Sequence, residues 1–98
     1  MGTKLPEEKF IVFAESWTEY ERGWGQRPDG YSYHLSKAHR DRYVDAYWER
    51  NKKDYVPDDY SKPDENLFPT EVGSELYNKI RESGDGVFGP NNPKKWQG

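Results

Sequence analysis

The chain has 98 residues, the size of one small domain, and only 32% of them are hydrophobic, against roughly 45–50% in typical globular domains. Half of that share is aromatic, and the formal net charge is −3. Because each aromatic side chain can bury roughly 150–250 Å², we expect a folded domain with a small, aromatic-rich core. The absence of cysteine excludes disulfides and thiolate zinc sites, and the sequence pI near 5.4 argues against a general nucleic-acid binder.

The first predicted elements are a leader and two strands. Residues 1–8 predict a flexible leader, and Lys9–Glu15 follows with apolar side chains on both alternating faces. That pattern is typical of a central strand covered on both sides. In Tyr31–Leu35 large apolar residues alternate with Ser32 and His34, which predicts a second, half-exposed strand.

The strongest helix signal lies in the middle of the chain. Ser36 is a suitable N-cap, and Lys37–Lys53 contains neither Gly nor Pro. Large apolar residues recur there at helical spacing and form one stripe: Tyr43, Val44, Tyr47 and Trp48. We therefore predict one long helix that packs on the sheet.

The second half of the chain predicts short elements. Asp54–Asn66 is rich in Pro and acids and predicts a loop. Leu67–Val72 predicts a third strand, which Pro69 confines to a sheet edge. A short helix follows, capped by Ser74 and stopped by Gly84.

The expected architecture follows from these elements. It is a single α+β domain over residues 9–84, followed by a Gly/Pro/Asn-rich tail over residues 85–98. We expect this tail to be mobile unless Trp96 docks on the domain. The domain is expected to hold a small antiparallel sheet of two to three strands, packed by one long and one short helix in the order β-β-α-β-α.

The segment Trp17–Gly30 is the first candidate binding site. Its 14 residues would make an unusually long loop between two strands, and Gly23 and Gly25 flank Trp24 within it. It holds residue types that are enriched at binding hot spots: Trp17, Tyr20, Arg22, Trp24 and Arg27. The alternative is that the two tryptophans fold back to cover the core while the neighbouring glutamates pair with the arginines.

The same segment carries a resemblance. The runs Phe13–Ser16, Thr18–Gly25 and Arg27–Tyr31, with Tyr43–Trp48 and Pro57–Ser61 further on, resemble small proteins encoded in bacteriophage and prophage genomes. No established activity comes with that resemblance, so no site residues are carried over. It implies an accessory protein that acts on a host protein or on host defence.

A second candidate surface lies in the predicted loop after the long helix. Lys37–Lys53 carries a net charge of +3, whereas Asp54–Glu71 carries −5. The two charged segments could simply be solvated, or satisfy each other. Alternatively the acidic loop could dock on a basic groove of a partner, through Tyr55, Asp58, Asp59 and Tyr60. A basic helix face that touches RNA is a weaker alternative.

The remaining chemistry is sparse. His34 and His39 lie in no metal-binding motif, and no cofactor motif is present. A carboxylate–base pair would arise if His34 faced Glu15 across the strands, with a serine nearby. We therefore expect a cytoplasmic, non-enzymatic protein that binds a host macromolecule, as a monomer or homodimer. The alternatives are an oligomer that binds a nucleotide or signalling molecule, and a small hydrolase-like enzyme.

Overall fold

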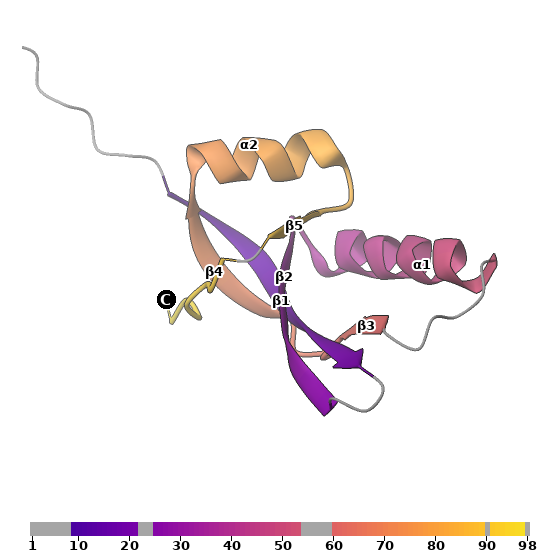
Figure 1. Ribbon diagram of the computed structural model, residues 1–98. Coiled ribbons are helices and arrows are strands. Elements are labelled where there is room, and N and C mark those ends of the chain that lie inside the picture. The colour runs from indigo at the N-terminus through magenta and orange to yellow at the C-terminus, as the bar shows by residue number, and fades with distance from the viewer. Residues whose placement is uncertain (1–8, 22–24, 54–59, 90, 98) are drawn as a thin grey trace, which may run out of the picture.

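The computed structural model describes residues 9–21, 25–53, 60–89 and 91–97. It is an α+β domain in which a twisted antiparallel sheet carries two helices (Figure 1). In chain order the elements are β1 (Lys9–Glu21), β2 (Gly25–His34), α1 (Lys37–Lys53), β3 (Tyr60–Pro63), β4 (Phe68–Gly73), α2 (Ser74–Ser83) and β5 (Val87–Gly89).

Strand β1 is the centre of the sheet. Along one edge it pairs with β2, and β5 extends the sheet beyond β2 opposite residues 31–33. The other edge of β1 is shared, because β4 pairs with residues 9–14 and β3 with residues 17–20. Ser16 bridges the gap: its carbonyl accepts from the Asp64 amide at 2.9 Å, and its amide donates to Asn66 Oδ1 at 3.1 Å.

The expected sheet of two to three strands is wrong, because the sheet has five strands. Strand β3 lies within the segment predicted as a loop, and β5 lies within the predicted tail. Both are only three or four residues long, too short to show an alternating pattern. They exist because each adds to an edge of the β1–β2 pair, which is a tertiary effect that local sequence does not encode.

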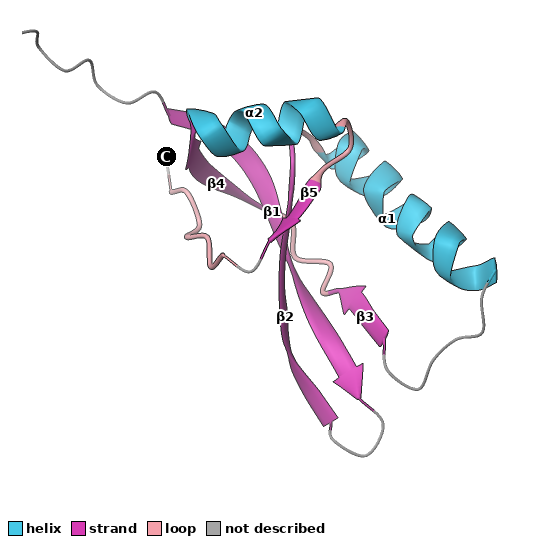
Figure 2. Cartoon of the chain, turned by 45° about the horizontal axis from the view of Figure 1, so that its top comes forward, coloured by secondary structure: helices cyan, strands magenta, loops and turns pink. Residues whose placement is uncertain are grey.

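The predicted loop Trp17–Gly30 is also wrong. Its described residues continue β1 and β2 as an antiparallel hairpin, with a register shift between Trp17 and Thr18 (Figure 2). A β-bulge of this kind bends and twists the pair locally. The irregularity and Pro28 break the apolar alternation, which is why this stretch does not look like a strand.

The helices cover opposite faces of the sheet. Ala14 points to one face, where it joins Val12, Tyr33 and Ile80 of α2 in a single buried cluster. Its neighbour Glu15 points to the other face, where α1 lies over it. The prediction of a central strand is therefore confirmed for β1, but coverage of both faces holds only near residues 14–17, because Ile11 is 41% exposed.

Strand β2 is covered on both sides as well, contrary to the half-exposed strand predicted. Tyr33 is buried on the α2 face, and Ser32 and His34 are fully buried on the α1 face. Polar side chains at alternate positions predicted a face exposed to solvent. Ser32 and His34 instead form a hydrogen bond with each other beneath α1.

The helix ends are set partly as expected. The Ser36 hydroxyl accepts from the His39 amide at 3.3 Å, which confirms Ser36 as the cap of α1. In α2 the N-cap is Gly73, not Ser74, and Gly84 ends the helix with φ 90°.

The segment after α2 is held against the domain. Beyond β5, the Trp96 amide donates to the Pro69 carbonyl at 2.8 Å, and Thr70 Oγ1 donates to the Lys94 carbonyl at 2.7 Å. These two hydrogen bonds tie residues 94 and 96 to β4, although every residue from 91 to 97 except Pro93 is exposed.

Candidate functional site

The sheet face beneath α1 holds a chain of buried polar groups. Trp17 Nε1 donates to Ser32 Oγ at 2.8 Å, and Ser32 Oγ lies 2.8 Å from His34 Nε2. His34 Nδ1 lies 2.8 Å from the carbonyl oxygen of Asp85. Because that carbonyl can only accept, Nδ1 carries the proton and Nε2 accepts the proton of Ser32. Each member of the chain thus has a partner.

The environment of His34 favours its neutral form. Burial lowers the pKa of the imidazole, while the Asp85 carbonyl and the nearby carboxylate of Glu15 act in the opposite direction. The ring of Tyr43 packs edge-on against His34, and burial raises the pKa of that phenol. Both rings are therefore uncharged near neutral pH.

One turn of α1 away lies a buried ion pair. Arg40 Nε and Nη2 donate to the two carboxylate oxygens of Glu15 at 2.6 and 2.9 Å, and Nη1 donates to Asp41 at 3.1 Å. The Glu15 side chain is fully buried and that of Arg40 is 17% exposed. This pairing with Glu15 raises the pKa of Arg40 further above its ordinary value, so the guanidinium stays charged.

Glu15, Ser32 and His34 thus come together on one face, as the pairing of Glu15 with Ser32 across the strands requires. A serine hydroxyl that donates to His Nε2 is the arrangement of a nucleophile and its base. All three side chains are fully buried, and the Trp17 indole N–H donates a hydrogen bond to the Ser32 hydroxyl oxygen. No substrate atom can reach Ser32 in this arrangement, so we assign the group to the stability of the fold.

The predicted binding residue Trp17 belongs to this interior. It is 2% exposed, and its indole packs edge-on against Tyr43, Tyr47 and Phe88. Its position matches the alternative interpretation, in which tryptophan covers the core.

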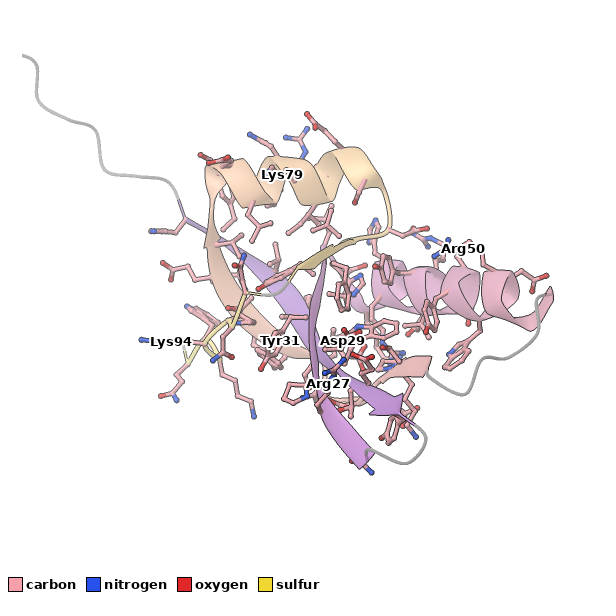
Figure 3. All side chains as sticks on the ribbon, in the orientation of Figure 1. Arg27, Asp29, Tyr31, Arg50, Lys79 and Lys94 are labelled. Atoms are coloured by element: carbon pink, nitrogen blue, oxygen red, sulfur yellow. The ribbon has the colours of Figure 1, made fainter. Side chains whose placement is uncertain are left out.

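The other described residues of the first candidate surface lie toward the turn of the hairpin. The side chain of Arg27, labelled in Figure 3, is 64% exposed. It pairs with Glu19 across the strands at an Nε–Oε2 distance of 3.2 Å. Tyr20 is half-buried, with the Lys62 ammonium 5.3 Å above its ring. Arg27 and Tyr20 are thus brought to the same end of the molecule.

Several predicted site residues lie outside the described residues. These are Arg22 and Trp24 of the first candidate surface, and Tyr55, Asp58 and Asp59 of the second. Tyr60 begins β3, where its backbone pairs with Tyr20. The candidate acidic surface is therefore described only at its last residue.

A cleft that the sequence did not indicate lies beside Tyr20. We call it the α1–β3 cleft; it has a volume of about 340 Å³ and runs between α1, β3 and the turn that follows β3. Its lining residues are Tyr20, Arg40, Val44, Trp48, Lys62, Pro63, Asp64 and Glu65. Arg40 and Glu65 also line a neighbouring cavity of about 190 Å³. No sequence signal joins these residues, because they come from three separate elements.

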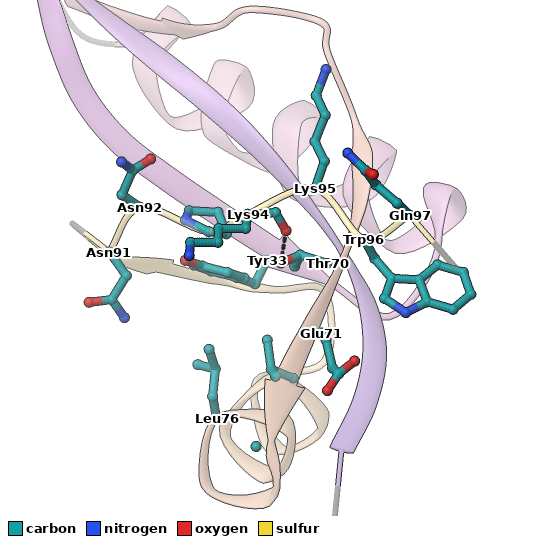
Figure 4. Close-up of a pocket in the computed structure, with 13 residues that line it drawn as sticks. Tyr33, Thr70, Glu71, Leu76, Asn91, Asn92, Lys94, Lys95, Trp96 and Gln97 are labelled. Carbon is teal, nitrogen blue, oxygen red and sulfur yellow. Dashed lines mark hydrogen bonds between the residues drawn. The ribbon is translucent and has the colours of Figure 1, made fainter.

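A larger cavity, of about 640 Å³, lies on the opposite face of the sheet. It is bounded by the buried Tyr33 and Thr70, by Leu76 of α2 and by residues 91–97 (Figure 4). In Figure 4 Trp96 points away from Tyr33, while Asn91 and Asn92 lie at the opposite end. The volume is in the range of small-molecule sites.

Other kinds of site find no support in the described part of the chain. Those residues contain no group of three or more His, Asp or Glu side chains that could hold a metal ion. They also contain no helix long and apolar enough to cross a membrane. Comparison with known protein families, with curated proteins and with solved structures finds no match for this chain.

Proposed function

We propose that this chain is a non-catalytic protein that binds another macromolecule through the outer half of the β1–β2 hairpin. We define the outer half by its described residues, 18–21 and 25–29. The resemblance to phage-encoded proteins makes a host protein the partner that we propose. Inhibition of that protein would be the biological result.

The observation that carries the proposal is the position of the hairpin. Its far end extends past both helices (Figure 2), and residues 25–28 are exposed. Trp17 is part of the core, which accounts for its presence. Tyr20 and Arg27 are not buried, so packing in the core does not account for them. Tyrosine, tryptophan and arginine are the residue types that dominate binding energy at interfaces, and the sequence from residue 18 to residue 29 contains Tyr20, Arg22, Trp24 and Arg27.

The test compares hairpin variants with a control on the far side of the molecule. Arg22→Ala, Trp24→Ala and Arg27→Ala are made beside Lys79→Ala on α2, whose side chain is 65% exposed. A partner recovered from a bacterial host lysate is purified, and its affinity for each variant is measured by calorimetry. We expect at least one hairpin variant to bind about 30-fold more weakly, the cost of a hot-spot residue, while Lys79→Ala binds normally.

Two results would count against this function. Unchanged affinity in all three hairpin variants would place the contact surface elsewhere. Loss of the folded state in Arg22→Ala or Trp24→Ala, seen by circular dichroism, would assign these residues to the core.

A second function is supported by the cavity of about 640 Å³ between α2 and residues 91–97. A small polar ligand bound there would stabilise the native state by mass action. A thermal-shift series of nucleotides and signalling molecules tests this alternative, because a ligand at 100 times its dissociation constant adds about 2.7 kcal/mol. A flat series would favour the macromolecular partner.

A further inference from the structure

The α1–β3 cleft combines aromatic and charged groups at the base of the hairpin. Val44 and Pro63 of its lining are buried, and the half-buried rings of Tyr20 and Trp48 belong to its wall. The ring of Trp48 packs edge-on against that of Tyr47, with 5.0 Å between the ring centroids. Because the Lys62 ammonium already lies 5.3 Å from the centroid of the Tyr20 ring, Trp48 is the part of this aromatic wall that can offer a π-face to a flat or cationic group.

The charges of the cleft are unequally available to a ligand. Arg40 directs three of its nitrogens to Glu15 and Asp41, so its charge is already matched. The Asp64 carboxylate accepts hydrogen bonds from the hydroxyls of Ser16 and Thr18, each at 2.7 Å. Glu65 differs from both.

The Glu65 carboxylate is exposed and makes no ion pair or hydrogen bond with any described residue. Its backbone has φ 58°, and Glu65 is the only described residue other than glycine in the left-handed region. Glycine or asparagine would hold that conformation with less strain. The turn therefore presents an unmatched negative charge beside the aromatic wall.

The charged groups around the α1–β3 cleft have a net negative charge, the same sign as the Glu65 carboxylate. The charged residues at the cleft and its adjoining cavity, with their ion-pair partners, are Lys37, Arg40, Lys62, Glu15, Asp41, Asp64 and Glu65. Three are basic and four are acidic, so a net negative charge remains. The complementary ligand is a cation.

We propose that the α1–β3 cleft binds an arginine side chain of the partner protein. The proposal rests on the proposed function and names the chemistry that the partner contributes. A guanidinium is planar and weakly hydrated, so it can stack on Trp48 while its paired N–H groups donate to the Glu65 carboxylate. A lysine ammonium would gain the charge but not the stacking, and Glu65 would repel an anion.

The test uses a small probe and the full-length chain. N-acetyl-arginine methylamide is titrated while the indole N–H signals of the four tryptophans are followed by NMR, with Trp48→Phe to identify the Trp48 signal. We expect a saturable shift of the Trp48 signal. The citrulline analogue has the same shape without the charge, and it should give no saturable shift.

Charge variants sharpen the result. Glu65→Gln should weaken arginine binding about three- to tenfold, because it removes a charge-assisted contact. Lys62→Gln should tighten it about two- to fivefold by removing a like charge. Glu75→Gln, on the exposed face of α2, is the matched control and should change nothing.

The inference is overturned if Trp48 does not respond to arginine, if citrulline binds equally well, or if Lys62→Gln weakens binding. The titration contains no partner protein, whereas the hairpin variants are scored on the partner alone. Failure of the proposed function would therefore appear in the partner measurements, and failure of the arginine site would appear in the titration.

Discussion

Replacing Arg40 with methionine should remove a large part of the stability of this domain, because it leaves the Glu15 carboxylate buried without its cation. Methionine retains much of the aliphatic stem of arginine but none of its donors. The side chain of Glu15 is fully buried, and its two oxygens accept at 2.6 and 2.9 Å from Arg40. Both bonds are lost together.

The magnitude follows from the burial of the pair. Removing one partner of a buried ion pair costs about 3–5 kcal/mol, and at 17% exposure the Arg40 side chain is only slightly screened by solvent. A domain of 98 residues has a free energy of unfolding of about 5–15 kcal/mol. At about 4–8 °C per kcal/mol for this size, Tm should fall by at least about 12 °C.

The assay is urea unfolding followed by tryptophan fluorescence. Lys37→Met, one turn earlier on α1, is the control, because the Lys37–Asp41 pair is exposed and worth at most about 1 kcal/mol. The double variant Glu15→Met with Arg40→Met should recover most of the loss, since apolar replacement of a buried pair is often neutral. A loss below about 1 kcal/mol in Arg40→Met would refute the assignment of Glu15 to a buried ion pair.

Three further predictions concern the buried polar chain. Trp17→Phe deprives Ser32 of its indole donor and should cost about 1–3 kcal/mol in urea unfolding, where an unchanged midpoint would contradict the contact. The lowered pKa of His34 means that the folded state binds fewer protons, so stability is complete above the unfolded pKa of about 6.5 and is lost as pH falls below it. His34→Gln should flatten that pH dependence, measured as the urea midpoint between about pH 7.5 and 5, and an unchanged slope would contradict this origin. Gly86→Ala would place a methyl group against the His34 ring and 2.7 Å from the Tyr33 carbonyl, so it should lower Tm by several degrees, and normal thermal unfolding would argue against this packing.

The elements whose apolar pattern extends over many consecutive residues could be predicted from the sequence. The stripe from Tyr43 to Trp48 and the cap at Ser36 define α1, and the two-sided apolar pattern of β1 identifies the central strand. The same local pattern cannot show that β1 continues past its bulge. Strands β3 and β5 depend on pairing with β1 and β2, and their own residues carry no comparable signal.

The site was less predictable, because residue type does not reveal whether a side chain is buried. Tryptophan is a residue type that is common at binding hot spots. Trp17 is equally suitable for the interior, because its indole N–H has a hydrogen-bond partner in Ser32. The pairing of Glu15 with Arg40 spans 25 positions and depends on how α1 crosses the sheet. The α1–β3 cleft needs three elements at once, so no single stretch of sequence indicates it.

The central position of β1 has a consequence for the exchange of backbone amide hydrogens with solvent. Ala14 and Trp17 have paired strands on both edges of β1, and their buried side chains lie beneath α2 and α1, respectively. These amides can exchange only when the whole domain unfolds, so their protection should equal the global free energy of unfolding. Strand β5 has three residues and a partner in β2, so its amides should exchange through a local opening of lower free energy. The inner part of β1 thus opens only with the whole domain, whereas the outer part of the hairpin can open locally.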